Sequence, residues 1–161
     1  MQAFILLAKD YPHIHWLVIG DGPEKTVLQN MAREANVSER VHFAGFRKDV
    51  PRCLQAMDTF ISPSYSEGLG LSLLEAMAAK KPVISTMVGG ISDFLVDYLN
   101  GLVISTKNPE EIRQNVVILM EDEGLRTKLA EAGYKTVKEE YTLTHMAMKT
   151  KELYRKLIRA K

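Results

Sequence analysis

The chain contains the stretch Pro63-Ser64-Tyr65-Ser66-Glu67-Gly68-Leu69-Gly70-Leu71-Ser72-Leu73-Leu74-Glu75-Ala76-Met77-Ala78. It opens with proline and serine, which are typical of loops, passes two glycines, and becomes an apolar run of good helix formers. The apolar segment 58–62 before it predicts a buried strand. Residues 58–79 therefore predict a strand, a glycine-bearing turn and a helix.

This turn predicts a binding place for an anion. The N–H groups at a helix start lack partners within the helix, and the helix dipole is positive there. Gly68 and Gly70 have no Cβ, so a phosphate can approach their backbone closely. Glu67 lies just before the helix and Glu75 about 12 Å along its axis. Carboxylates accept hydrogen bonds strongly, so the pattern suits a nucleotide sugar with hydroxyl-rich groups on both sides of its diphosphate.

The same stretch, followed by Pro82-Val83-Ile84, resembles the signature of family 4 (group 1) glycosyltransferases, in which two glutamates are separated by seven residues. Here those glutamates are Glu67 and Glu75. The resemblance covers residues 1 to 105, within the donor-binding C-terminal domain of that family. Four more motifs carry it in order and spacing: Val18-Ile19-Gly20-Asp21-Gly22-Pro23, Val41-His42-Phe43-Ala44-Gly45-Phe46, Val88-Gly89-Gly90 and Asn100-Gly101-Leu102-Val103.

The resemblance implies an α/β fold of the GT-B type, with a Rossmann-like parallel sheet and helices on both faces. It also implies a retaining sugar transfer from a UDP- or GDP-linked sugar, with no cofactor and no bound metal. Glu67 would act at the sugar ring as the catalytic residue, and Glu75 would hold the ribose. The remaining donor-binding positions implied are Gly20, Gly22, Phe46, Arg47, Gly68, Leu69, Gly70, Leu71, Gly89 and Gly90.

Several of these positions also have a purely structural interpretation. The turn at 20–23 has Lys25 where a dinucleotide fingerprint has its third glycine, so it borders the donor pocket or is an ordinary strand-to-helix turn. Phe46 contacts the base or packs the end of the sheet. Glu75 has apolar or small helical neighbours, which predicts a semi-buried face where an unpaired carboxylate is costly. It would serve the donor there, or cap a backbone group.

The resemblance also implies a strand and a basic turn ahead of residue 1, and before them an acceptor domain. In the strand order 3-2-1-4-5-6 that strand is the centre of the sheet. We therefore expect residues 1–161 to form one donor-binding domain that lacks its first strand and the N-terminal acceptor domain. Two half-sheets with unpaired inner edges should result, and the isolated chain should be a poor catalyst.

The bulk composition is that of an ordinary globular protein. At 161 residues the chain predicts one domain, with 46% hydrophobic residues and a net charge of +1, which gives no hint of a nucleic-acid partner. One cysteine, Cys53, suits a reducing cytoplasm. No segment is long and apolar enough for a membrane span, and the four histidines show no metal-ligand spacing.

Periodicity and turn signals place the other elements. Strands are expected near 14–19, 41–44, 82–86 and 101–104, and helices near 1–10, 24–35, 109–122, 124–133 and 143–160. A helix should start at 50–51, with Asp49 as its cap, and a short helix should open at Gly89-Gly90.

The final helix, 143–161, is a second candidate for a partner surface. Leu143, Met146, Leu153 and Leu157 form an apolar stripe, and residues 149–161 carry six basic side chains against one acidic. The favoured interpretation is a closing helix that docks on the N-terminal domain. The alternative is contact with an anionic membrane that carries a lipid-linked acceptor.

Two functions follow. The first is the donor-binding half of a retaining glycosyltransferase in glycan or polysaccharide biosynthesis, working with an N-terminal acceptor domain or a separate chain. The second is a non-catalytic nucleotide-binding or assembly module, or a truncated relic. The first predicts a cytoplasmic protein, and contact through 149–161 would place it peripherally at a membrane.

Overall fold

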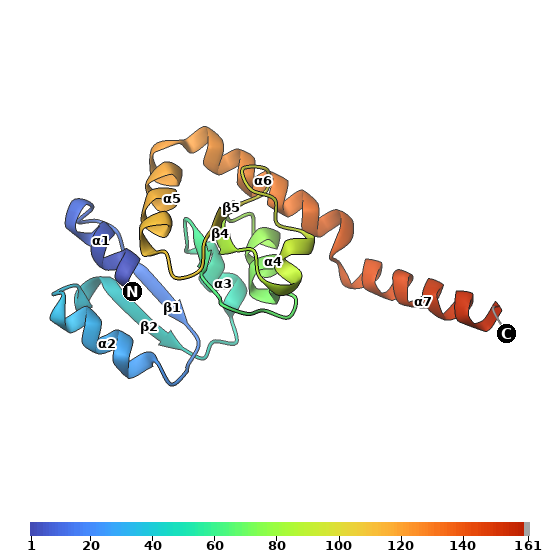
Figure 1. Cartoon of the computed structure of the whole chain (residues 1–161), viewed down its shortest axis with the longest axis horizontal. Helices are drawn as coiled ribbons and strands as arrows, with labels where there is room; N and C mark the ends of the chain where they lie inside the picture. The colour runs from blue at the N-terminus through green and yellow to red at the C-terminus, as the bar shows by residue number, and fades with distance from the viewer. Residues whose placement is uncertain (160–161) are drawn as a thin grey trace.

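The computed structural model describes residues 1–159, and the last two residues of the final predicted helix lie outside the described part. Strands alternate with helices, as the sequence predicts (Figure 1). The strands are β1 (Trp16–Ile19), β2 (Val41–Gly45), β3 (Phe60–Ser62), β4 (Val83–Thr86) and β5 (Leu102–Ile104). The helices are α1 (Gln2–Asp10), α2 (Lys25–Glu34), α3 (Val50–Gln55), α4 (Leu71–Ala78), α5 (Pro109–Glu121), α6 (Glu123–Glu140) and α7 (Leu143–Arg159), with short 3₁₀ helices η1 (Ser38–Arg40) and η2 (Gly89–Asp93).

The strands form two separate parallel sheets, which confirms the expected pair of half-sheets. One sheet has the order β1-β2 and the other β3-β4-β5. Trp16 pairs with Val41 in the first, and Ile84 pairs with Ile61 and Leu102 in the second. Over residues 1–159 no ladder joins β1 to β3, so each of these strands has a partner on one side alone.

Helices cover both faces of the three-stranded sheet. On one face Val83 packs into a core with Leu54 of α3 and with Leu73 and Met77 of α4. On the other face Ile84 packs with residues of α1, α5 and α6. Neighbouring β4 side chains thus enter different cores, because successive residues of a strand point to opposite faces. This half of the molecule is a complete sandwich of helix, sheet and helix.

The two-stranded sheet rests on a smaller core of its own. Trp16 and Val18 pack beside Phe4 of α1 and Ala32 of α2. The rings of Phe4 and Trp16 lie 6.0 Å apart between centres. Helix α1 joins the halves, because its Leu7 packs into the core of the other sheet.

Two expectations for the helices were wrong in detail. Helix α6 continues to Glu140 instead of ending at Gly133. A Cβ at Gly133 would lie 3.2 Å from both the Asn100 carbonyl oxygen and Met77 Cγ, so this glycine serves close packing and not a helix end. Asp49 is at the start of α3, but its side chain makes no capping hydrogen bond and pairs with Arg47 instead.

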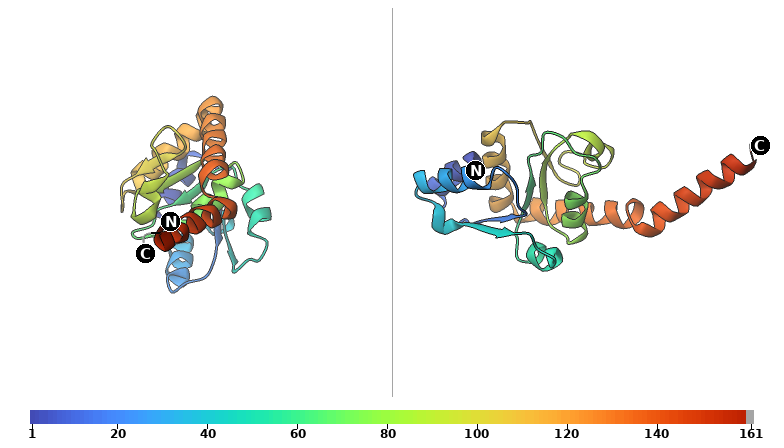
Figure 2. Two further views of the ribbon diagram at one scale, coloured as in Figure 1. Left: turned by 90° about the vertical axis from the view of Figure 1, so that its right-hand side faces the viewer. Right: turned by 90° about the horizontal axis from the view of Figure 1, so that it is seen from below.

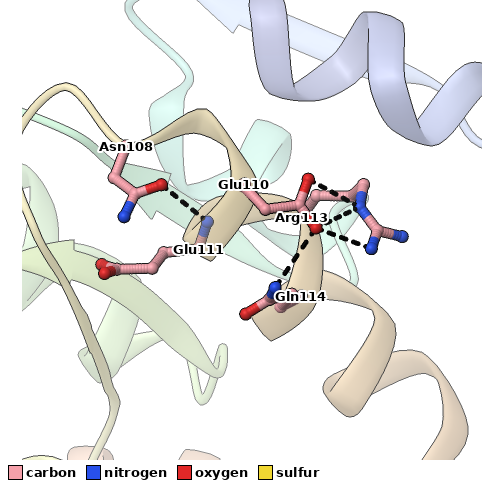
Figure 3. A network of polar contacts seen from close by, with 5 residues as sticks. All are labelled: Asn108, Glu110, Glu111, Arg113 and Gln114. Atoms are coloured by element: carbon pink, nitrogen blue, oxygen red, sulfur yellow. Dashed lines mark hydrogen bonds and ion pairs between the residues drawn. The ribbon is translucent and has the colours of Figure 1, made fainter.

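A side chain caps the N-terminus of helix α5 (Figure 3). Asn108 Oδ1 accepts a hydrogen bond from the Glu111 N–H at 3.2 Å, and Glu110 pairs with Arg113 at 2.7 Å. Asp122 caps α6 in the same way, through the Leu125 N–H at 2.8 Å. The start of α4, at Gly70, has no such side-chain cap.

Helix α7 projects away from the body in both Figure 1 and Figure 2. It has no buried residue, and Leu143 at its start is 80% exposed. Its apolar stripe is therefore uncovered. Within the described part of the chain, no helix combines the length and hydrophobicity that crossing a membrane requires.

Candidate donor-binding site

The turn between β3 and α4 forms as the sequence predicts. Gly70 is the residue before the helix, with a left-handed backbone (φ 76°) that glycine adopts without strain. Its carbonyl accepts the first helical hydrogen bonds, from Leu73 at 3.0 Å and Leu74 at 3.2 Å. No side chain caps this end, in contrast to α5 and α6. The first N–H groups of α4 are thus not occupied by a side chain, at the positive end of the helix dipole.

The structure gives Gly89 and Gly90 a packing role against this turn. A Cβ at Gly89 would overlap the Glu67 carbonyl oxygen, and one at Gly90 would come within 2.5 Å of the Gly68 carbonyl oxygen. The Gly90 N–H donates to that Gly68 oxygen at 2.8 Å. The segment after β4 therefore supports the turn after β3 backbone to backbone. By contrast, a Cβ at Gly68 would meet nothing within 4 Å, which leaves one side of the turn open.

Hydroxyl groups position Glu67. Ser64 Oγ donates to Glu67 Oε1 at 2.8 Å and lies 3.3 Å from Ser62 Oγ. Thr86 of β4 donates to the Ser64 carbonyl at 2.7 Å. The half-buried Glu67 is therefore held by Ser64 in the loop after β3, and β4 holds that loop through Thr86. Sequence reasoning missed Ser64 and Thr86, although a serine three residues before the glutamate was a signal for the first.

The expected semi-buried face around Glu75 was wrong. Glu75 is exposed, and so are Leu71 (66%) and Ser72 on the same face of α4. Helix α4 turns its other face, with Leu73 and Met77, into the core. The small and apolar neighbours of Glu75 therefore face outward. The Glu75 carboxylate is not buried among them and does not need a partner to offset a cost of burial.

The other predicted donor positions follow β1 and β2. Gly20 (φ 114°) and Gly45 (φ 62°) both adopt backbone conformations that favour glycine, and the Gly20 N–H donates to the Gly45 carbonyl at 2.8 Å. Gly22 is exposed with open space around it. Phe46 is 78% exposed, so it does not pack the end of the sheet.

Arg47 is engaged locally. Its Nε and Nη2 donate to the two Asp49 oxygens at 2.8 and 2.7 Å. The hydrogen bonds from this guanidinium lower the pKa of Asp49, and the same bonds raise the pKa of Arg47. The Arg47 guanidinium is therefore paired with Asp49 in this structure.

The structure thus brings the predicted residues together in two groups. One group surrounds α4 and contains Glu67, Gly68, Leu69, Gly70, Leu71, Glu75, Gly89 and Gly90. The second contains Gly20, Gly22, Phe46 and Arg47, on the half-sheet of β1 and β2. Exposed apolar side chains follow three strands at their carboxyl ends: Phe46 after β2, Tyr65, Leu69 and Leu71 after β3, and Met87 after β4. In open α/β sheets ligands bind at this edge.

Comparison with known proteins identifies the fold and the family. A model of the family described as glycosyl transferases group 1 matches residues 1–136. The lipopolysaccharide core biosynthesis glycosyltransferase LpsE of Rhizobium meliloti is 36% identical over 126 residues, which cover 78% of this chain and 37% of LpsE. The alpha-monoglucosyldiacylglycerol synthase of Acholeplasma laidlawii is 34% identical over 148 residues, which cover 87% of this chain and 36% of that protein. The chain spans little more than a third of the length of these relatives.

Solved structures agree. The C-terminal domain of LpcC, a group 1 family glycosyl transferase from Francisella tularensis, has a TM-score of 0.81 and 33% identity, covering 88% of this chain and 77% of that one. TarM of S. aureus, solved in complex with UDP, has a TM-score of 0.87 and 25% identity over 95% of this chain and 31% of that one. HepE of Anabaena, also in complex with UDP, shows the fold at a TM-score of 0.89 and 21% identity, over 97% of this chain and 45% of that one. The fold is that of a GT-B C-terminal domain, and the chain belongs to the group 1 glycosyltransferases.

Proposed function

We propose that this chain is the donor-binding half of a retaining glycosyltransferase that transfers a sugar from a nucleotide-diphosphate sugar in glycan or polysaccharide biosynthesis. The observation that carries the proposal is the α4 turn, where an uncapped helix start lies beside the oriented Glu67. Family membership supports it, as does the UDP bound by TarM. The relatives' names, which include lipopolysaccharide core synthesis, favour a glycan product.

In this proposal the diphosphate lies on the N–H groups around residues 68–71. The open side of Gly68 lets a phosphate reach the backbone. As the sugar is transferred, negative charge grows on the departing diphosphate. The positive end of α4 stabilises that charge more in the transition state than in the bound donor, which is how a fixed dipole accelerates a reaction.

The two glutamates have different settings and so different roles. Glu67, fixed by Ser64 at 2.8 Å, is placed to hold the sugar ring near the reacting carbon. Glu75 is exposed on the outer face of α4 and is free to accept hydrogen bonds from the ribose hydroxyls. The donor that the proposal requires is a sugar linked to UDP or GDP, and the transferred sugar goes to an acceptor held by the other half of the enzyme.

The rest of the enzyme is an acceptor-binding half that residues 1–161 do not include, since the chain covers 36–37% of the relatives' length. On its own the chain should bind nucleotide and turn over slowly or not at all. The alternative is a non-catalytic nucleotide-binding or assembly module. A catalytic half should gain transferase activity when an acceptor-binding half is supplied, whereas a module should not.

Helix α7 is the second contact expected of this enzyme. Its exposed stripe of Leu143, Met146, Leu153 and Leu157 is long enough to dock on an acceptor-binding half. A membrane surface is the alternative partner, supported by the basic residues of 149–159 and by the lipid in the name of the Acholeplasma laidlawii relative. Pelleting of the chain with vesicles that contain anionic lipid, but not with neutral vesicles, would favour the membrane.

Titration calorimetry with UDP and GDP tests the donor site. Glu75→Ala should weaken binding of the preferred nucleotide by about 10- to 100-fold, because hydrogen bonds to a charged group are worth about 1.5–3 kcal/mol. Glu121→Ala, at the exposed end of α5, is the matched control and should leave affinity unchanged. Unchanged affinity in Glu75→Ala would remove that residue from the pocket, and no binding of either nucleotide to the wild type would overturn the proposal.

A further inference from the structure

Two histidines that are 27 residues apart along the chain meet on the two-stranded sheet. His15 lies directly before β1, and His42 is the second residue of β2. The two strands run in parallel, with Leu17 opposite His42 (Figure 1). His15 Nδ1 lies 3.0 Å from His42 Nε2. Spacing along the chain does not reveal this pair, because the parallel pairing of the two strands creates it.

The two imidazole rings meet edge to edge. Their planes are 19° apart and their centres 5.2 Å apart, so the facing nitrogens are closer to each other than the ring centres are. A neutral imidazole carries a proton on one nitrogen and a lone pair on the other, so one facing nitrogen donates to its partner. When that proton moves to the outer nitrogen of its own ring, both facing nitrogens offer lone pairs to the space between them.

The separation of these nitrogens suits a metal ion. Zn²⁺ binds imidazole nitrogen at about 2.0–2.1 Å, so two nitrogens 3.0 Å apart subtend an angle of about 90–100° at the ion. That angle matches neighbouring ligands in square-planar or octahedral coordination. Opening the pair by about 0.3–0.4 Å gives the tetrahedral angle that is usual for Zn²⁺. Both residues are exposed, so their rings have room for this adjustment.

The backbone that leads into each histidine is held by Arg40, the last residue of η1. The Arg40 guanidinium donates to the Ala8 carbonyl at 3.1 Å and to the Tyr11 carbonyl at 3.2 Å. These hydrogen bonds hold the segment before His15 against the segment before His42. The two ligands are therefore positioned before an ion binds, which lowers the entropy that binding costs.

The pair supplies two protein ligands. Among residues 1–159 no group of three or more histidine, cysteine, aspartate or glutamate side chains is arranged to hold a metal ion. Water therefore completes the coordination of an ion at this pair. Closed structural zinc sites have four protein ligands, so an ion held by two is exchangeable.

We propose that His15 and His42 form a site for one late transition-metal ion, such as Zn²⁺, which links β1 to β2. Imidazole nitrogen is a ligand that Zn²⁺, Ni²⁺ and Cu²⁺ all accept. The ion binds the folded arrangement of the two strands and so stabilises the half-sheet that rests on the smaller core. The site lies at the amino ends of the strands, whereas the predicted donor residues follow their carboxyl ends. The proposal is therefore independent of the donor site.

Titration calorimetry with ZnCl₂ tests the site on the untagged chain, treated with EDTA and then dialysed. One Zn²⁺ should bind per chain. His15→Gln and His42→Gln each remove one ligand and keep a polar side chain, so each should weaken binding at least about tenfold. His145→Gln is the matched control. The His145 Nδ1 lies 2.8 Å from Thr142 Oγ1, away from the pair in sequence and in the fold, and its loss should leave the affinity unchanged.

Two further measurements locate the ion between the strands. In NMR spectra of the wild type, Zn²⁺ should shift the ring resonances of His15 and His42 and leave those of His145 in place. Unfolding by urea is followed by the fluorescence of Trp16, the single tryptophan, which lies next to His15. With free Zn²⁺ at 100 times its dissociation constant, the ratio of folded to unfolded chain should rise about 100-fold. The double variant of His15→Gln and His42→Gln should show no such rise.

Three results would overturn the proposal. The first is no binding, and no shift of the two ring resonances, at millimolar Zn²⁺. The second is unchanged affinity in the double variant, which would place the ion elsewhere. The third is one ion for every two chains, which would mean that the ion joins two copies and not two strands. Normal UDP or GDP binding is compatible with each of these results, so the proposed function stands or falls separately.

Discussion

Strands β1 and β4 are alike in length and differ in setting. Both are four residues long and rich in β-branched or bulky apolar side chains. All four residues of β4 are buried, and all four of β1 are half-buried. β4 lies between two strands and under helices on both faces, whereas β1 has one strand beside it and one core below it.

The difference teaches that burial in this molecule depends on position in the sheet more than on the strand's own residues. A strand with neighbours on both sides contributes to two cores, as Val83 and Ile84 do. The edge strand β1 is entirely apolar, and yet it leaves apolar surface and backbone groups exposed to water. The three-stranded half should therefore contribute most of the free energy of unfolding, and the two-stranded half should be the less stable of the two.

The largest effect is expected from Gly89→Ala in the three-stranded half. The added Cβ would overlap the Glu67 carbonyl oxygen, and φ is +54°. Neither backbone segment can yield without breaking the Gly90–Gly68 hydrogen bond. The free energy of unfolding, measured by urea titration, should fall by more than about 3 kcal/mol.

Gly22→Ala in the turn after β1 is the matched control. A Cβ there meets nothing within 4 Å, so the free energy of unfolding should stay within about 0.5 kcal/mol of wild type. Equal losses in the two variants would contradict the contrast between a tightly packed half and an open one.

A smaller effect separates the two strands directly. Val83→Ala empties fully buried space in β4 and should cost about 2–3 kcal/mol, whereas Val18→Ala in β1 should cost about 1 kcal/mol. Trp16, the single tryptophan, reports on the two-stranded half. In Val18→Ala its fluorescence should change at lower urea than the far-ultraviolet circular dichroism. Coincident transitions would mean that the halves unfold as one unit.

Periodicity and turn residues predicted most of the elements, because these signals act locally, whereas the split sheet was expected from the strand order that the resemblance implies. The separation of β1 from β3 followed from strand order and was confirmed. Continuation of α6 through Gly133 was missed, because the reason lies in Asn100 and Met77, which are distant in sequence. A glycine looks like a helix end until its neighbours in space are known.

At the candidate site the turn was predictable and the environment of its acids was not. Gly70 and the uncapped α4 follow from local sequence. Burial of Glu75 was inferred from small and apolar neighbours, but that face of α4 is open over the described residues. Orientation of Glu67 depends on Thr86, a residue of another strand that reaches it through the Ser64 backbone. Such pairings between strands are not encoded in the spacing of one motif.

The smallest effect concerns Tyr141, which ties α6 to η2 in the three-stranded half. Its ring lies 5.3 Å from that of Phe94, and its hydroxyl donates to the Asp93 carbonyl at 3.3 Å. Burial raises the pKa of Tyr141 above its ordinary value near 10. As pH rises past 10, the phenol ionises first in the unfolded chain, which stabilises that chain relative to the folded one. The stability that the neutral phenol supplies is therefore complete below pH 10 and is lost as pH rises through the folded pKa.

Tyr141→Phe removes both the titration and the hydrogen bond. At neutral pH the variant should lose about 0.5 kcal/mol of unfolding free energy. Above pH 10 the wild type should lose stability relative to the variant, so melting temperatures of the two should converge. All other ionisable groups are the same in the two proteins, so their effects on stability cancel in the difference. Melting curves that stay parallel from pH 7 to 11 would show that Tyr141 ionises alike in both states, and the alkaline response would then lie outside this contact between α6 and η2.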